Sequence, residues 1–161
     1  MSEVYGEIGF LKKTILNIIS SDVDTVQEVV GFEKTGFRGF PAVTVVCTGN
    51  DNSFYSSTEN ERVFNFVIRI FVPIENKPKL ETTSDAAKEN AEKIMERAVD
   101  QIIVALDTTT RFTMADAADN GVEAVPTAWG YALLPIGWCR QANIDLKIKR
   151  TLNVNTGLTG G

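Results

Sequence analysis

Ten consecutive residues, VFNFVIRIFV from Val63 to Val72, constrain the fold of this chain more than any other stretch. Large apolar side chains stand at every second position, which is the spacing of a β-strand with one face in a hydrophobic core. The predicted core face consists of Phe64, Phe66, Ile68, Ile70 and Val72. The intervening positions are half apolar, which allows the second face of the strand to be covered as well.

Two more strands are predicted before this one. The segment VQEVVGF, Val26 to Phe32, has apolar residues on both sides of the polar pair Gln27 and Glu28 and precedes a glycine-rich turn, KTGFRG. Pro41 then begins PAVTVVC, because proline is tolerated at the start of a strand but not at its centre. This strand is predicted to end at Thr48 and Gly49, so that residues 49–62 form a long polar loop.

Helical spacing appears in two segments. From Ser2 to Ser20, apolar residues recur three and four positions apart, as on one side of a helix: Val4, Ile8, Leu11, Ile15, Ile18 and Ile19. A longer helix is predicted from Ser84, a suitable N-cap, to Leu106. Its apolar stripe comprises Ala87, Ala91, Ile94, Met95, Ala98, Val99, Ile102 and Leu106, and oppositely charged pairs such as Lys88 with Glu92 and Glu89 with Lys93 mark its solvated side.

The C-terminal third contains a second long connection and two strands. Residues 107–121 show no sustained period and are predicted to form a loop. The segment from Val122 to Trp138 is interrupted by Pro126, Gly130 and Pro135, which predicts an irregular or edge strand. Alternation from Ala142 to Lys149 predicts the last strand, and residues 153–161 form a small, polar, flexible tail.

The order of elements is therefore α-β-β-β-α-β-β. An antiparallel, or mixed, sheet of about five strands with both helices packed on one face would bury every apolar stripe just described. We expect an α+β fold in which residues 1–152 form a single domain.

Composition excludes several functions. The 161 residues include no histidine, which removes the commonest general base and the usual partner of a nucleophilic serine or cysteine. A net charge of −5 argues against binding nucleic acid through its phosphate backbone. No stretch approaches the ~20 apolar residues of a membrane span, so we expect a soluble protein made in the cytoplasm. Cys47 and Cys139 are expected to behave as small apolar residues, with a disulfide between them left open.

No metal, cofactor or catalytic site is predicted. The run NDNS with Glu59 and Glu61 contains the oxygen ligands that calcium prefers, but a twelve-residue calcium loop starting at Asp51 would place Ser56 where glycine is needed and Arg62 where an acid is needed. Four acids, Asp107, Asp116, Asp119 and Glu123, could supply a carboxylate pair, although nothing in the sequence fixes their separation. We therefore expect that the chain is not an enzyme.

Apolar residues in the two predicted loops favour an interaction surface. Exposed aromatic side chains are costly unless a partner covers them. The candidate interface residues are Phe54, Tyr55, Arg62, Arg111, Phe112 and Met114. Trp129 and Trp138, on strand segments, are instead expected to be buried within the fold. Lys147, Lys149 and Arg150 fit either the solvated face of a sheet or a charge match to an acidic neighbouring subunit.

The layout resembles the tail terminator family of long-tailed bacteriophages. The resemblance rests on an N-terminal amphipathic helix, then FPAVTVV, a polar run, VFNFVIRIFV, the helix AEKIMERAVDQIIVAL and the strand ANIDLKIKRTL. It implies a structural virion protein of the tail or neck that forms a homo-oligomeric, hexameric ring. Such a ring would cap the tail tube by binding the tail tube protein, and it would also bind head-completion or connector proteins. DNA would pass through its lumen without specific binding.

The resemblance also suggests a purpose for the acidic residues. Six copies at −5 each would carry about −30, and a negative lumen would repel passing DNA; Glu59 and Glu61 are the candidate lumen-facing acids. Another head-tail joining or neck adaptor protein remains an alternative. From a different class, a small carboxylate-dependent enzyme or a ligand-binding α+β domain also remains open.

Overall fold

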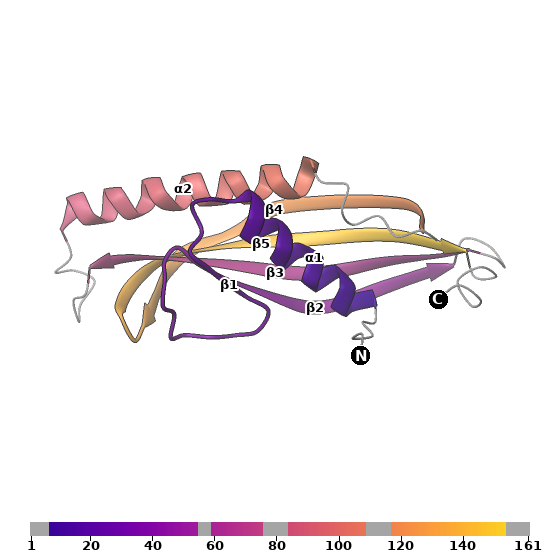
Figure 1. Ribbon diagram of the computed structural model, residues 1–161, viewed down its shortest axis with the longest axis horizontal. Helices are drawn as coiled ribbons and strands as arrows, with labels where there is room; N and C mark the ends of the chain where they lie inside the picture. Colours follow the sequence, from indigo (N-terminus) through magenta and orange to yellow (C-terminus); the bar gives the residue numbers. More distant parts are fainter. Residues whose placement is uncertain (1–6, 55–58, 76–83, 109–116, 154–161) are drawn as a thin grey trace.

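A single mixed sheet carries both helices on one face, as Figure 1 shows. The computed structural model describes residues 7–54, 59–75, 84–108 and 117–153. Its elements in chain order are α1 (Glu7–Asp22), β1 (Glu28–Val30), β2 (Ala42–Phe54), β3 (Glu59–Glu75), α2 (Asp85–Thr108), β4 (Ala117–Leu134) and β5 (Gly137–Asn153). The predicted α+β class, order of elements and two-layer arrangement are confirmed.

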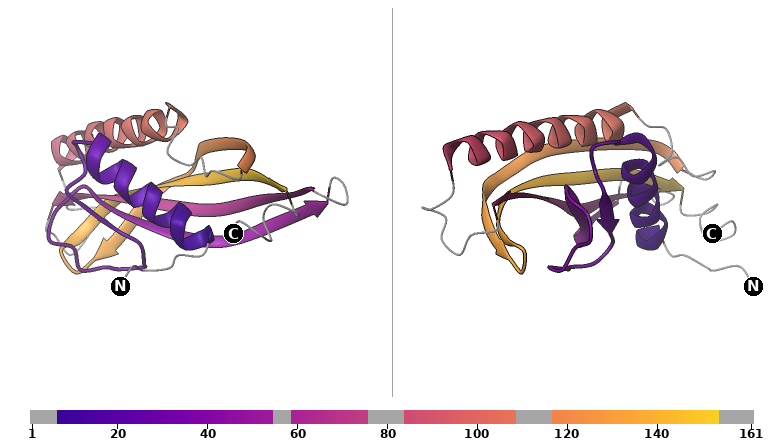
Figure 2. Two further views of the ribbon diagram at one scale, coloured as in Figure 1. Left: turned by 45° about the vertical axis from the view of Figure 1, so that its right-hand side comes forward. Right: turned by 60° about the vertical axis from the view of Figure 1, so that its left-hand side comes forward.

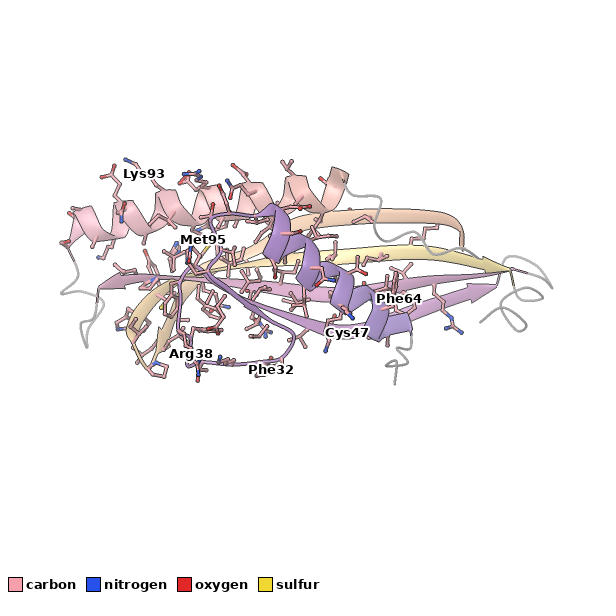
Figure 3. All side chains as sticks on the ribbon, in the orientation of Figure 1. Phe32, Arg38, Cys47, Phe64, Lys93 and Met95 are labelled. Carbon is pink, nitrogen blue, oxygen red and sulfur yellow. The ribbon has the colours of Figure 1, made fainter. Side chains whose placement is uncertain are left out.

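The core lies between the two helices and the face of the sheet that they cover, here called the inner face. All five residues of the predicted core face of β3 are buried, Phe64 and Phe66 among them. Met95 of α2 points toward the sheet, whereas Lys93 points away from it (Figure 3). Burial of each such apolar side chain is worth about 1.5–3 kcal/mol. The apolar faces of the strands and of the helices therefore determine how the helices pack on the sheet.

The start of α2 is capped as predicted. The backbone N–H of Ala87 donates to Oγ of Ser84 over 3.1 Å, which satisfies one of the amides that a helix leaves unpaired at its first turn. Asp85 lies in the same turn, where the helix dipole favours negative charge. Of the predicted α1 stripe, Ile8 is 42% exposed at the start of that helix, and Val4 lies outside the described residues.

The strand order is β1-β2-β3-β5-β4. β3 lies between β2 and β5, and β5 lies between β3 and β4, with all three pairings antiparallel. β1 is parallel to β2 and covers only Ala42, Val43 and Thr44. Within the described residues, β2 therefore has no strand on its second side from Val45 to Phe54, and β4 has none along its whole length. These two stretches are the open edges of the sheet.

The prediction of a long polar loop at residues 49–62 is wrong. β2 continues to Phe54 and β3 begins at Glu59, with cross-strand partners from Gly49 opposite Asn65 to Phe54 opposite Asn60. Strand pairing uses backbone amides and carbonyls, so an existing ladder can extend through polar side chains. A bulge between Cys47 and Gly49 precedes the extension, and the φ of 148° at Gly49 suits glycine alone.

The prediction of a loop over residues 107–121 is also wrong at both ends. α2 reaches Thr108 and β4 begins at Ala117, so only residues 109–116 separate them, and these lie outside the described residues. The prediction that the following strand is irregular and at an edge is confirmed. β4 is an edge strand, and it has a bulge in which Thr127 has no partner between Pro126 and Ala128.

A second, smaller cluster covers one end of the outer face of the sheet. Phe71, Leu134 and Cys139 are buried there against Phe37, Phe40 and Ala132. The connection at residues 31–41 is tied back to β1, because Glu28 accepts hydrogen bonds from the backbone N–H of Arg38 (3.0 Å) and from Nζ of Lys34 (2.9 Å). The Arg38 amide and then the Lys34 ammonium lower the pKa of Glu28.

Both cysteines are free thiols. Cys139 is fully buried, and this burial raises its pKa to about 11. Cys47 is half-buried and packs against the main core beside Val43 and Val45, on the alternating face expected for it. The expectation that both behave as small apolar residues agrees with these positions.

Candidate functional site

The sequence-predicted interface residues gather only in part. Phe54, Glu59, Glu61 and Arg62 lie at the far end of the β2–β3 hairpin, where Ser53 faces Glu61 and Asn52 faces Arg62. Arg62 is half-buried, and the side chains of the other three are outside the described part of the chain. Tyr55, Arg111, Phe112 and Met114 lie wholly outside the described residues, so their predicted roles stay predictions.

A different apolar surface is exposed at the other end of the molecule. Trp129, Tyr131 and Leu133 alternate along β4 and are 37%, 45% and 59% exposed. Their cross-strand partners on β5 are Ala142, Arg140 and Trp138, and buried Ala142 places all three on the inner side of the sheet. We call these three residues the hairpin patch. The prediction that Trp129 is buried is wrong, while Trp138 is half-buried.

The hairpin patch is exposed because the sheet bends away from the helices here. In Figure 2 the end of the β4–β5 hairpin curves away from α2, which leaves part of the inner side of β4 uncovered. A sequence signal for this surface exists: AVPTAWGYALL, from Ala124 to Leu134, has no charged residue although it lies in a strand predicted at an edge. Edge strands that face solvent usually carry charges.

Arg140 holds the aromatic residues of the hairpin patch in place. Its Nε donates to Oε2 of Glu92 on α2 over 2.6 Å, and its Nη1 donates to the carbonyl oxygen of Gly130 over 3.0 Å. The guanidinium carbon lies 4.7 Å from the ring centroid of Tyr131 and 5.8 Å from that of Trp129, within the range of cation–π attraction. The two rings therefore have a fixed arrangement before any partner arrives.

The described surface has several open hollows. One of them, about 570 Å³, lies between the end of α1 and α2 and is lined by Asp22, Asp24, Asp100, Gln101, Val104 and Ala105. A second, about 390 Å³, separates the 31–41 connection from the outer face beside Arg69, whose guanidinium pairs with Glu33 over 2.7 Å. No group of three or more His, Cys, Asp or Glu residues suited to a metal ion occurs among the described residues.

Of the four acids that could have formed a carboxylate pair, Asp119 and Glu123 lie on the same strand, β4, and Asp116 lies outside the described residues. Asp107 is in the last turn of α2, and Glu123 is in β4 with Lys147 as its cross-strand partner. Lys147 is exposed on the outer face of the sheet, which agrees with the solvated position predicted for it, and Lys149 is half-buried on the same face. The side chain of Arg150 is outside the described part of the chain. None of the described helices is long and apolar enough to span a membrane.

Comparisons with known proteins give a distant structural likeness. No protein-family model matches the chain, and no curated protein matches its sequence. Among solved structures, the chain is similar to a chain of the virion of a native gene transfer agent particle, with 15% identity, a TM-score of 0.40 and coverage of 93% of this chain and 99% of that chain. A likeness this distant carries no argument about function.

Proposed function

We propose that the chain is a structural virion protein, a bacteriophage tail terminator, that acts by assembly and not by catalysis. In this proposal it forms a hexameric ring, caps the tail tube and joins it to the head-completion or connector proteins. The observation that carries the proposal is the hairpin patch, an exposed, uncharged and preordered surface on an edge strand. Tryptophan, tyrosine and arginine are the residues that dominate binding energy at protein interfaces.

The sequence supports the same proposal independently. It lacks histidine, and its net negative charge suits a lumen that DNA passes through. The order of its elements also resembles that of tail terminators. A head-tail joining adaptor would use the same surfaces, and the two roles differ only in the partners they bind. A ligand-binding domain is the candidate from another class, favoured by the hollow beside Asp22, Asp24 and Asp100.

The first experiment measures assembly. Light scattering and negative-stain imaging of the purified chain over a wide concentration range, alone and with the tail tube protein, should reveal a closed ring of about six copies. Leu133→Ser should raise the concentration needed for the ring by roughly tenfold, the effect of about 1.4 kcal/mol. Val104→Ser on α2 is the matched control, because Val104 is 60% exposed and Leu133 is 59% exposed.

Two outcomes would count against the proposal. Equal effects of Leu133→Ser and Val104→Ser would show that the hairpin patch has no special part in assembly. A monomer under every condition, together with a ligand found for the acidic hollow, would favour the ligand-binding alternative.

The lumen role of Glu59 and Glu61 is a separate part of the proposal. Both lie in the β2–β3 hairpin, away from the hairpin patch. Substituting both with lysine should slow DNA passage through reduced repulsion while leaving the ring intact. Phage infectivity reports the passage, and unchanged infectivity would remove these two residues from the lumen.

A further inference from the structure

Both open edges of the sheet belong to strands long enough to pair with another chain. β4 is 18 residues long, and the open stretch of β2 runs from Val45 to Phe54. Unpaired amides and carbonyls along such edges are templates for strand addition. The described residues contain no third element that lies beside either edge within the sheet.

Neither edge is fully protected against pairing with another chain, as the edge strands of monomeric proteins usually are. Asp51 is the only charged residue of the open stretch of β2, and β4 has none after Glu123. Pro126 and the bulge beside it interrupt β4 locally, and a second register shift lies between Ala117 and Asp119, but the pairing is regular from Asp119 to Pro126 and from Ala128 to Leu134. Charges, prolines and bulges normally block pairing along an edge, so these edges are only partly blocked.

The directions of the two edge strands make them complementary. Three antiparallel pairings separate β2 from β4, so the two strands run in opposite directions. A second copy placed beside the first in the same orientation would therefore set its β2 antiparallel to the first copy's β4. Antiparallel pairing is the more stable kind per residue.

From this geometry we infer that β4 of each copy pairs antiparallel with β2 of the next copy, so that one sheet continues around the ring. This inference rests on the proposed function, since a head-to-tail contact closes into a ring only if the rotation between copies allows it. It also leaves no edge open, whereas a two-fold pairing of β4 with β4 would leave both β2 edges unpaired.

The rows of the sheet predict which residues meet. Cys47, Phe66, Leu146 and Ala124 are successive cross-strand partners in one row. Direct continuation of that row would place Ala124 of one copy beside Cys47 of the next. A stagger between copies must be an even number of residues to keep apolar side chains on the inner face, so Val122 and Pro126 are the next candidates.

The same arrangement would cover the hairpin patch. Trp129, Ala142, Ile70 and Val43 share another row, and Val29 of β1 is the next partner beyond Val43. The hairpin patch of one copy would then meet β1 of its neighbour and the segment after it. That segment begins with Gly31 and Phe32, and Phe32 is 60% exposed.

Cysteine cross-linking tests the pairing with the native thiol of Cys47. Single variants Val122→Cys, Ala124→Cys and Pro126→Cys are made in a Cys139→Ala background, and the assembled chain is oxidised with copper phenanthroline. Facing residues of antiparallel strands have Cβ atoms about 4.5–5.5 Å apart, near the spacing a disulfide needs. At least one variant should convert most of the chain into a ladder larger than a dimer, which Cys47→Ser should abolish.

The control and the contrary outcomes separate this inference from the proposed function. Glu96→Cys, at an exposed position of α2, should give no ladder. A ring by light scattering with no Cys47-dependent ladder would overturn the edge pairing and leave the proposed function standing. Cross-linked dimers that do not need Cys47 would indicate β4 paired with β4 and overturn it too. Absence of any oligomer, with or without the tail tube protein, would overturn both.

Hydrogen exchange on the unsubstituted chain provides a second test that needs no variant to fold. Assembly should slow amide exchange in residues 45–54 and along β4, because their free N–H groups become hydrogen-bonded. Protection confined to α1 and α2 would contradict edge pairing.

Discussion

Arg140 and Glu92 are joined by a charge-assisted hydrogen bond of 2.6 Å between Nε and Oε2, 48 positions apart in the sequence. Their side chains are 16% and 37% exposed, so solvent screens the pair only in part. Because Arg140 also donates to the Gly130 carbonyl oxygen, one side chain connects α2, β5 and β4. The position of the hairpin patch thus depends on a residue of α2.

Removing the carboxylate of this pair should destabilise the fold. Glu92→Ala is expected to lower the free energy of unfolding by about 1–2 kcal/mol, because Arg140 stays partly buried with one ionic partner fewer. Urea unfolding measures the change. Lys93→Ala is the control, since Lys93 pairs with Glu89 at 3.2 Å and both side chains are about 70% exposed; its effect should stay within about 0.5 kcal/mol. Equal losses of stability in the two variants would show that the Arg140–Glu92 hydrogen bond contributes no more than an exposed ion pair does.

Two phenylalanines offer a direct comparison of core and surface. Phe66 is fully buried on the inner face of β3, whereas Phe32 is 60% exposed. Phe66→Ala should cost about 3–5 kcal/mol through lost burial and the remaining cavity. Phe32→Ala should change the free energy of unfolding of the monomer by no more than about 0.5 kcal/mol. Thermal unfolding of the two variants at one concentration tests this, and a large effect at Phe32 would contradict its exposure.

Two glycines of the 31–41 connection should respond differently to alanine. A Cβ at Gly39 would lie 2.9 Å from Cβ of Gln27, closer than such atoms approach, whereas a Cβ at Gly36 would meet nothing within 4 Å. Gly39→Ala should destabilise by about 1–3 kcal/mol through the forced backbone shift. Gly36→Ala should be neutral or stabilise by up to about 1 kcal/mol, because it restricts the unfolded chain. If urea unfolding showed Gly36→Ala to be the more destabilising variant, the 31–41 connection would not have the conformation described here.

The buried thiol predicts a stability change at high pH. Burial raises the pKa of Cys139 from 9.0 to about 11. Between these pH values the unfolded chain loses the thiol proton while the folded chain keeps it, so the free energy of unfolding falls as pH rises. The effect should be no more than about 2 kcal/mol, and it should be absent below pH 9.

Comparison with Cys139→Ala isolates this effect from other groups that titrate in the same range. The difference in stability between the two proteins should be constant below pH 9 and shrink toward pH 11. A constant difference throughout would show that the thiol ionises with the same pKa in both states. Thiol labelling of the folded chain at pH 8 should also modify half-buried Cys47 before Cys139.

The core was predictable because its pattern is local. Phe64 to Val72 alternate within ten residues, and the stripe of α2 repeats within a helix, so each signal needs no knowledge of distant parts. Ser84 was predictable as an N-cap for the same reason. The two-layer arrangement then followed from the need to bury every stripe at once.

What the sequence did not reveal depends on distant partners. The polar end of the β2–β3 hairpin is strand because β5 continues beside it as far as Asn153, a pairing that side-chain hydrophobicity does not encode. Glu92 was assigned to a helical pair with Lys88, but its partner is Arg140 on another element. Trp129 was expected in the core because aromatic residues on strands usually are buried, but it is 37% exposed on a hairpin that curves away from α2.

The bulge at Thr127 changes which positions of β4 face the inner side of the sheet. Before it, inner positions are even-numbered, as at Val122 and Ala124; after it they are odd-numbered, as at Trp129 and Tyr131. Deleting Thr127 would remove the bulge and leave a regular ladder in which Trp129 still faces Ala142. Pairing Thr127 with Asn143 would instead turn the aromatic residues toward the side where Gln141 and Asn143 lie. Leaving Thr127 unpaired therefore decides which side of the subunit carries the aromatic residues, and a slip of register at this point would alter assembly more than most substitutions.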